Sequence, residues 1–373
     1  MQPTYLYDFQ RIPARFSLEQ ARAARNLVEL RILLHGRAVE HGSPLPALDR
    51  QVLERRVQRF AAAASAIDTR GTEVEDYVLD LPSDRERLAL FRCAYPPDIE
   101  RRMEIYKARA EERLEQFYPA ASALPDHLIH VTCTGYVAPS PAQVAAARSG
   151  RTQVTHAYHM GCYASLPAIR IGRGLARAGR PAHIVHTELC SLHFNPMTVE
   201  AEQLVVQSLF ADGHIKYSVG TEAPALGLEI CVLNEKVLPD SRDRMTWTIG
   251  AQQFNMTLSR EVPTSITPHL RAFVSDLLRE AGVGAGSSFV YAVHPGGPRI
   301  IDEVARTLEL ESSQTAESRE ILRRHGNMSS ATLPHIWEEI LDNSARADGD
   351  VVVSLAFGPG LTLSGGVFRI CRA

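Results

Sequence analysis

The sequence predicts an α/β protein built from two similar halves that divide near residue 225. Residues 18–66 and 84–118 are rich in Ala, Leu, Glu and Arg with apolar residues at helical spacing, which predicts helices. From residue 127 onward, short β-branched runs alternate with helical segments in two successive rounds. Such alternation is typical of parallel or mixed sheets covered by helices. We therefore expect an N-terminal half over residues 1–225 and a C-terminal half over residues 226–373.

The individual elements follow from the same patterns. The expected strands are short apolar, β-branched runs at residues 127–133, 183–189, 214–219, 228–233, 289–294, 350–356 and 364–370. The expected helices between them span residues 164–179, 199–210, 265–282, 299–309, 316–325 and 329–343. The early helices are interrupted by Gly-Ser-Pro at 42–44 and Tyr-Pro-Pro at 95–97.

Composition excludes several classes of function. The 373 residues carry 40 Lys+Arg and 43 Asp+Glu, a net charge of −3, which argues against sequence-blind binding of nucleic acid. No apolar run approaches the length of a membrane-spanning helix, so membrane insertion is not expected. Six cysteines without a CxxC pair indicate reduced thiols and a cytoplasmic location.

Cys162 is the candidate nucleophile. It follows the β-branched segment at 153–155 and precedes a helical stretch, with Gly161 before it to permit a tight turn. A thiol at a helix N-terminus is expected to have a lowered pKa, because the helix dipole favours the thiolate. The alternative interpretation is a buried structural cysteine.

Two further polar residues also lie at the ends of elements. His294 follows an apolar strand and precedes Pro-Gly-Gly-Pro, a rigid turn that would orient a general base, although a histidine can also simply end a strand. Asn327 lies just before a helix, where it is either an N-cap or an amide donor to an oxyanion. A cysteine, a histidine and an asparagine in this order fit the logic of acyl-transfer enzymes.

A metal site is not expected. His183, His186 and His193 recur near one another, but His183 and His186 face opposite sides of an alternating strand. Zinc requires three or four converging ligands.

The chain resembles the type III polyketide synthases, the chalcone-synthase-like condensing enzymes of the thiolase superfamily. The resemblance rests on five blocks: GCYA at 161–164, LFADG at 209–213, VHPGGPRIID at 293–302, HGNMSSA at 325–331 and the glycine-rich ending at 357–362. It covers residues 50–373, while the first 45 or so residues diverge. It implies a thiolase-like fold of five αβαβα layers and a homodimer.

The resemblance also implies an activity, an iterative decarboxylative condensation. Cys162 would take an acyl group from acyl-CoA, and His294 and Asn327 would hold malonyl-CoA, promote loss of CO2 and stabilise the enolate. The expected product is an alkylpyrone or alkylresorcinol. A single-round ketosynthase, with an acyl carrier protein as a possible partner, and a non-catalytic acyl-CoA-binding protein are the alternatives. CoA thioesters would be substrates, and no resident cofactor is implied.

The resemblance also implies roles for further residues of this chain, some of which differ from the residue type usual in the family. Phe210 matches the gatekeeper phenylalanine between the CoA tunnel and the cavity. CoA would pass Gly296 and Gly297 and meet a basic cluster at Arg55, Arg56 and Arg59, in which a third basic position reads Ala63. The remaining expected cavity residues are Cys133, Thr134, Cys190, His193, Trp247, Met256, Ser329 and Phe357. Small Cys133 and Cys190 favour an extra acyl tunnel, whereas bulky Trp247 and His193 favour a closed cavity, and the sequence leaves both open.

Overall fold

The computed structural model describes residues 2–43, 45–61, 66–81, 83–92, 97–284 and 286–373. Nine strands of this described chain form one hydrogen-bonded sheet in the order β11-β12-β13-β8-β1-β7-β6-β4-β5. Their bounds are β1 Tyr5–Ile12, β4 His127–Thr132, β5 Gln153–Tyr158, β6 Ala182–Leu189, β7 Asp212–Gly220, β8 Leu226–Val237, β11 Phe289–Val293, β12 Val351–Gly358 and β13 Thr362–Arg372. Two small antiparallel pairs accompany it: β2 (Phe16–Glu19) with β3 (Thr69–Thr72), and β9 (Met245–Ile249) with β10 (Phe254–Leu258).

The large sheet falls into two groups of strands, one from each half of the sequence. Strand β1 pairs antiparallel with β7 along its length, and it joins β8 through the pairs Tyr5↔Glu229 and Leu6↔Leu228. The chain passes from one group to the other between β7 and β8. The division near residue 225 falls in this link, and its status as a domain boundary stays a prediction.

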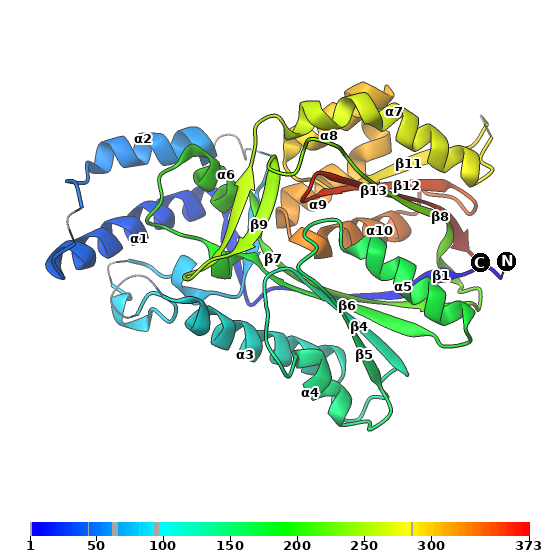
Figure 1. Ribbon diagram of the computed structural model, residues 1–373, viewed down its shortest axis with the longest axis horizontal. Helices are drawn as coiled ribbons and strands as arrows, with labels where there is room; N and C mark the ends of the chain where they lie inside the picture. The colour runs from blue at the N-terminus through cyan, green and yellow to red at the C-terminus, as the bar shows by residue number, and fades with distance from the viewer. Residues whose placement is uncertain (1, 44, 62–65, 82, 93–96, 285) are drawn as a thin grey trace.

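Helices cover both outer faces and fill the space between the two groups, as Figure 1 shows. The principal helices are α1 Gln20–Glu40, α2 Arg50–Ala61, α3 Ile99–Phe117, α4 Pro141–Ala147, α5 Ser165–Arg177, α6 Ala201–Leu209, α7 Val262–Glu280, α8 Pro298–Leu308, α9 Ala316–His325 and α10 Thr332–Asp342. Helices α5 and α10 contact strands of both groups, α3 and α4 contact the N-terminal group, and α7 contacts the C-terminal group. The resulting order of layers is αβαβα, which confirms the expected fold class.

Most predicted elements are present, and the largest error lies near the N-terminus. Strand β1 was not expected, although it joins the two groups of strands. The predicted helix over 84–118 is wrong in its first part: a short 3₁₀ turn spans Arg85–Arg87, and α3 begins at Ile99. The side chain of Asp98 accepts a hydrogen bond from the Arg101 backbone N–H, so this residue caps the helix and fixes its start.

Three connections bring distant parts of the chain together at one edge of the layers. Cys162 lies between β5 and α5, His294 directly follows β11, and Asn327 lies between α9 and α10. No helix among the described residues is long and apolar enough to cross a membrane.

Candidate active site

Cys162 sits in a tight turn that only glycine accommodates at its first position. Gly161 has φ +83°, and a Cβ atom there would lie 2.8 Å from Cδ of Pro359. The turn delivers Cys162 three residues before α5, with its side chain buried at 6% exposure. The sulfur therefore faces a cavity rather than bulk solvent.

His294 is held by its backbone, while its ring is left without partners. Its N–H donates to the Leu355 carbonyl at 2.8 Å, which extends the pairing of β11 with β12. Its own carbonyl accepts from the Gly296 N–H at 3.0 Å. Neither ring nitrogen has a hydrogen-bond partner among the described residues, although the residue is only 1% exposed.

Asn327 is fixed even more firmly. Its N–H donates to the Leu209 carbonyl at 2.9 Å, and its carbonyl accepts from the Ala211 N–H at 2.8 Å, so its backbone pairs on both sides of Phe210. Its Oδ1 accepts from the Ser329 N–H at 2.9 Å. This bond turns Nδ2 away from the backbone, and Nδ2 lacks a hydrogen-bond partner within the described part of the chain.

These three side chains line one cavity of about 390 Å³. Phe210 and Phe357 also line it, as do Gly296 and Gly297. Buried polar atoms in native proteins nearly always have partners, and the nitrogens of His294 and Asn327 that no described protein group engages are available to a bound molecule that accepts hydrogen bonds. The cavity thus presents a thiol and two potential donors to one bound molecule.

Burial determines the charge states of the site at rest. It raises the pKa of Cys162 to about 12, although the nearby Ser329 hydroxyl opposes the rise. It also lowers the pKa of His294 to about 3, so the imidazole is neutral near pH 7. The expectation of a lowered pKa for Cys162 is therefore wrong, because desolvation by burial is the largest effect on this thiol and raises its pKa.

A chain of hydrogen bonds connects Cys162 to a buried carboxylate. The Ser329 hydroxyl lies 3.8 Å from Sγ of Cys162 and 2.9 Å from Sγ of Cys133. Glu188 accepts from the backbone N–H of Cys133 at 3.0 Å and from the Thr134 hydroxyl at 2.9 Å. The sequence offered no signal for Glu188, because a single glutamate in an apolar strand matches no local motif.

A second, much smaller chamber shares Cys162 and Phe210 with the large cavity. Its volume is about 30 Å³, room for about two water molecules. The expected cavity residues that line it are Cys133, Thr134, Cys190, His193, Phe210, Trp247, Met256 and Ser329. The structure therefore gathers all of these residues around one space next to Cys162.

An aromatic cluster of His193, Trp247 and Phe254 fills this side. The His193 ring stacks on Phe254 with centroids 4.2 Å apart, and Trp247 meets both rings edge-on. His193 Nε2 donates to the Thr134 carbonyl at 2.8 Å, and Trp247 Nε1 donates to the Cys133 carbonyl at 2.6 Å. The bulky side chains of His193 and Trp247 thus form part of the wall of the small chamber, while the extra acyl tunnel that Cys133 and Cys190 favour stays a prediction.

The three clustered histidines serve separate hydrogen-bond networks. His183 pairs with the Tyr118 hydroxyl at 3.0 Å, whereas His186 pairs with the Ser330 hydroxyl at 3.0 Å on the other side of β6. Within the described residues, no group of three His, Cys, Asp or Glu side chains converges as metal ligands do.

Comparison with known proteins agrees with this geometry. Residues 229–371 match the family of chalcone and stilbene synthases, C-terminal domain. "Probable polyketide synthase 1" of Dictyostelium discoideum is 31% identical over 217 residues, which cover 55% of this chain and 7% of that protein. The resemblance to type III polyketide synthases is confirmed.

Solved structures show the fold over the whole chain. The C-terminal type III polyketide synthase domain of Steely1, a type I/III hybrid from Dictyostelium, superposes with a TM-score of 0.81 at 21% identity over 99% of both chains. PKS-I of the brown alga Ectocarpus siliculosus gives 0.82 at 21% identity, covering 99% of this chain and 98% of that one. The 1,3,6,8-tetrahydroxynaphthalene synthase of Streptomyces coelicolor gives 0.78 at 22% identity, covering 99% and 100%.

Three arginines line the cavity, but they are not the set that the sequence analysis expected. Arg59 lines the cavity, together with Arg260 and Arg299, which the sequence analysis did not select. The Nε of Arg56 instead donates to the Val199 carbonyl at 2.7 Å, outside the lining. Arg55 is likewise absent from the described lining, and Ala63 lies outside the described residues. Arg260 was missed because it has no neighbouring motif.

Proposed function

We propose that the chain is an acyltransferase that condenses malonyl-CoA iteratively onto an acyl-CoA starter. The observation that carries the proposal is the buried pair of unpaired donors, His294 and Asn327, in the cavity that also exposes Cys162. A thiol is suited to hold an acyl group, and two neutral donors are suited to stabilise an enolate oxygen.

The first step loads the starter onto Cys162. Because burial raises the pKa of Cys162, the thiol must lose its proton as it attacks the acyl-CoA carbonyl, and the neutral His294 imidazole is the acceptor. The carbon–sulfur bond to CoA breaks as the bond to Cys162 forms. The proton then passes from His294 to the departing CoA thiolate, which leaves as CoA-SH.

The second step makes the carbon nucleophile. The thioester carbonyl of malonyl-CoA accepts hydrogen bonds from Asn327 Nδ2 and from the protonated nitrogen of neutral His294. Loss of CO2 leaves its electron pair in the enolate, whose developing oxyanion the two donors stabilise. The enolate carbon attacks the acyl carbonyl on Cys162 and expels the thiolate, and the lengthened chain on CoA can reload.

The product and assembly follow as parts of the same proposal. The starter is a medium or long acyl-CoA, the product an alkylpyrone or alkylresorcinol, and the chain acts as a cytoplasmic homodimer without a resident cofactor. The small chamber of about 30 Å³ favours few extensions, which keeps a single-round ketosynthase as the second candidate.

Product analysis tests the proposal and separates the candidates. The protein is incubated with malonyl-CoA and a panel of acyl-CoA starters, and the products are identified by mass spectrometry. Products that contain several malonyl-derived units support the iterative enzyme. Products with a single added unit support the ketosynthase, and no condensation with any starter contradicts both.

A further inference from the structure

Ser329 has a backbone conformation that is unusual for a residue with a side chain. Its φ of +50° lies in the left-handed region, where the Cβ atom of an L-residue comes close to a carbonyl oxygen. Such a conformation persists only where the surrounding structure determines it, and it is most common at active sites. Ser329 begins the short 3₁₀ turn η6 (Ser329–Ala331), two residues after Asn327. This turn therefore needs contacts that hold it in place.

The first contact joins the turn to the Asn327 carboxamide. The Ser329 N–H donates to Asn327 Oδ1 at 2.9 Å. The carboxamide oxygen is thus engaged, and Nδ2, which no described residue engages, is the end that remains for a molecule in the cavity. The two ends of the carboxamide cannot exchange without loss of this bond. The position of the Ser329 N–H therefore determines where the Nδ2 donor points.

The next residue of the turn, Ser330, is bound by one face of strand β6. His186 and Glu188 are two residues apart on this strand, so their side chains lie on the same face. The Ser330 hydroxyl donates to Glu188 Oε1 and lies 3.0 Å from His186 Nδ1. All three side chains are completely buried. Ser330 thus connects the turn to two points of the large sheet.

The partners of His186 determine which of its ring nitrogens carries the proton. The single proton of the Ser330 hydroxyl is used toward Glu188, so its oxygen accepts from the Nδ1–H of His186. Burial lowers the pKa of His186 well below its ordinary value of 6.5, and the ring is therefore neutral with Nε2 unprotonated. Nε2 accepts from the Tyr217 hydroxyl at 3.1 Å. The result is a directed series of hydrogen bonds from Tyr217 through His186 and Ser330 to Glu188.

Glu188 is also fixed at its other carboxylate oxygen. Its Oε2 accepts from the Cys133 N–H at 3.0 Å and from the Thr134 hydroxyl at 2.9 Å. The bond to Glu188 alone fixes only the distance between Ser330 and the carboxylate. The bond from His186 also fixes the direction in which the Ser330 hydroxyl lies, and both bonds together hold the turn.

We propose that His186 is a positioning residue for decarboxylation: through Ser330 it holds the turn that directs the Asn327 Nδ2 donor at the thioester oxygen of malonyl-CoA. This inference rests on the proposed function, since that function gives Asn327 its role in the step. Neither His186 nor Ser330 is among the described residues that line the cavity, so His186 acts through the turn and not on the substrate. A small misplacement of a reacting or stabilising group has a large effect on rate.

Two amide substitutions of His186 each keep one of its two hydrogen bonds. His186→Asn places an N–H close to the position of Nδ1 and keeps the bond to Ser330. His186→Gln places its amide close to the position of Nε2 and keeps only the bond with Tyr217. His183→Gln is the matched control, because His183 lies on the opposite face of the same strand and pairs with the Tyr118 hydroxyl at 3.0 Å.

The measured quantity is the ratio of two rates at a temperature where every variant is folded. One rate is the formation of acetyl-CoA from malonyl-CoA, and the other is the acylation of Cys162, followed by intact mass. The ratio should fall by about tenfold in His186→Gln, a change that corresponds to the net free energy of one hydrogen bond. It should recover most of this loss in His186→Asn and keep the wild-type value in His183→Gln.

A purely structural role of His186 would lower both rates equally. A wild-type ratio in His186→Gln would therefore overturn the inference. If neither His186 variant folds, the ratio in Ser330→Ala decides, because this variant also releases the turn from β6, and a wild-type ratio there would overturn the inference as well.

A double-mutant cycle tests the route through Ser330. If His186 acts through this hydroxyl, the ratio in Ser330→Ala should not fall further when His186→Gln is added. Additive losses would show that His186 acts by another route and would contradict the proposal.

The outcomes separate this inference from the proposed function. If the wild-type protein performs both half-reactions but His186→Gln and His186→Asn have the same ratio, His186 is not a positioning residue and the proposed function stands. If the wild-type protein neither decarboxylates malonyl-CoA nor accepts an acyl group on Cys162, the proposed function fails and this inference fails with it.

Discussion

Replacing Asn327 by alanine separates the two half-reactions proposed for the site. The substitution removes the Nδ2 donor, which is completely buried and lacks a partner among the described residues. Loss of one donor to a developing oxyanion costs about 10²- to 10³-fold in rate, or about 3–4 kcal/mol. Decarboxylation of malonyl-CoA should fall by this factor, while acylation of Cys162 should fall less, because His294 still accepts the thiol proton.

The same substitution has a second, structural cost. Asn327 Oδ1 accepts from the Ser329 N–H at 2.9 Å, and an unsatisfied buried N–H costs about 1–3 kcal/mol of stability. Thermal unfolding of the variant measures this cost separately from the chemistry. Asn255→Ala on the exposed side of β10 is the control and should leave both half-reactions unchanged.

The assay measures acetyl-CoA formed from malonyl-CoA by chromatography and the acyl-enzyme by intact mass. Equal losses of decarboxylation and acylation in Asn327→Ala, at a temperature where the variant is fully folded, would refute the division of roles between Asn327 and His294.

Three further predictions concern stability and cavity shape. Arg70→Met removes donors to the Gln207 and Phe210 carbonyls, and we expect a loss of about 2–5 kcal/mol in chemical unfolding together with a lower kcat; an unchanged unfolding midpoint would contradict this role. Trp247→Gly enlarges the small chamber, so mass spectrometry should find products with more malonyl-derived units than the wild-type protein makes. An unchanged product distribution would count against the aromatic cluster as the limit on chain growth. Burial lowers the pKa of four histidines, His130, His193, His294 and His335, from 6.5 to about 3. The unfolded state therefore binds more protons than the folded state below pH 6.5, and the free energy of unfolding falls as the pH falls. Between about pH 7.5 and about pH 5.5 thermal unfolding should show a loss on the order of 1 kcal/mol per histidine, and equal stability at the two pH values would refute the buried neutral state of these side chains.

The candidate site residues that lie at the ends of helices and strands could be predicted from the sequence. Cys162, His294 and Asn327 each lie at the end of an element, and strand–helix alternation predicted these elements except β5, the strand that precedes Cys162. Once the strands pair, the ends of these elements meet at one edge, and the structure brings the three side chains to one cavity. Short motifs and hydrophobic periodicity can locate the ends of elements because both depend on residues that are close together in the sequence.

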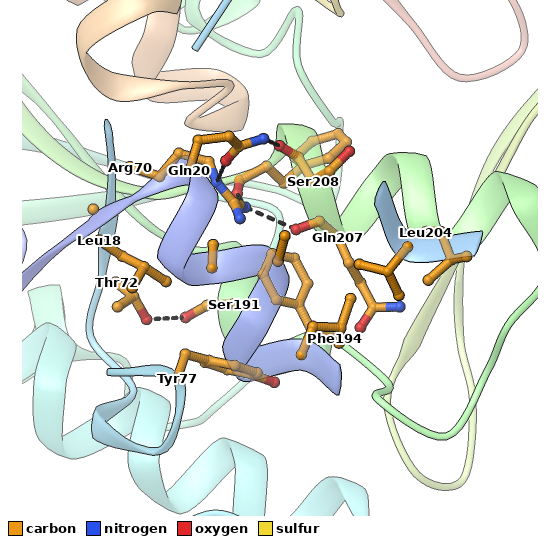
Figure 2. A pocket seen from close by; sticks show the side chains of 16 residues that line it. Leu18, Gln20, Arg70, Thr72, Tyr77, Ser191, Phe194, Leu204, Gln207 and Ser208 are labelled. Atoms are coloured by element: carbon orange, nitrogen blue, oxygen red, sulfur yellow. Dashed lines mark hydrogen bonds between the residues drawn. The ribbon is translucent and has the colours of Figure 1, made fainter. Parts of the chain in front are cut away.

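Features that depend on packing between distant segments could not be predicted in this way. The helix dipole at Cys162 is a local effect, whereas the burial that raises its pKa comes from the surrounding layers. The stack of His193 on Phe254 joins residues that lie far apart in the sequence. A pocket of about 40 Å³ that Leu18, Leu27, Val57 and Leu204 help to line (Figure 2) likewise needs β2, α1, α2 and α6 at once, and none of these segments alone signals a cavity.

The most direct test of the central claim is the mass of the intact protein after incubation with an acyl-CoA. The account predicts one acyl adduct on the wild-type chain, mapped to Cys162 by peptide analysis, and none on Cys162→Ala. An adduct that persists in Cys162→Ala, or a wild-type protein that remains unmodified by every acyl-CoA tested, would contradict it.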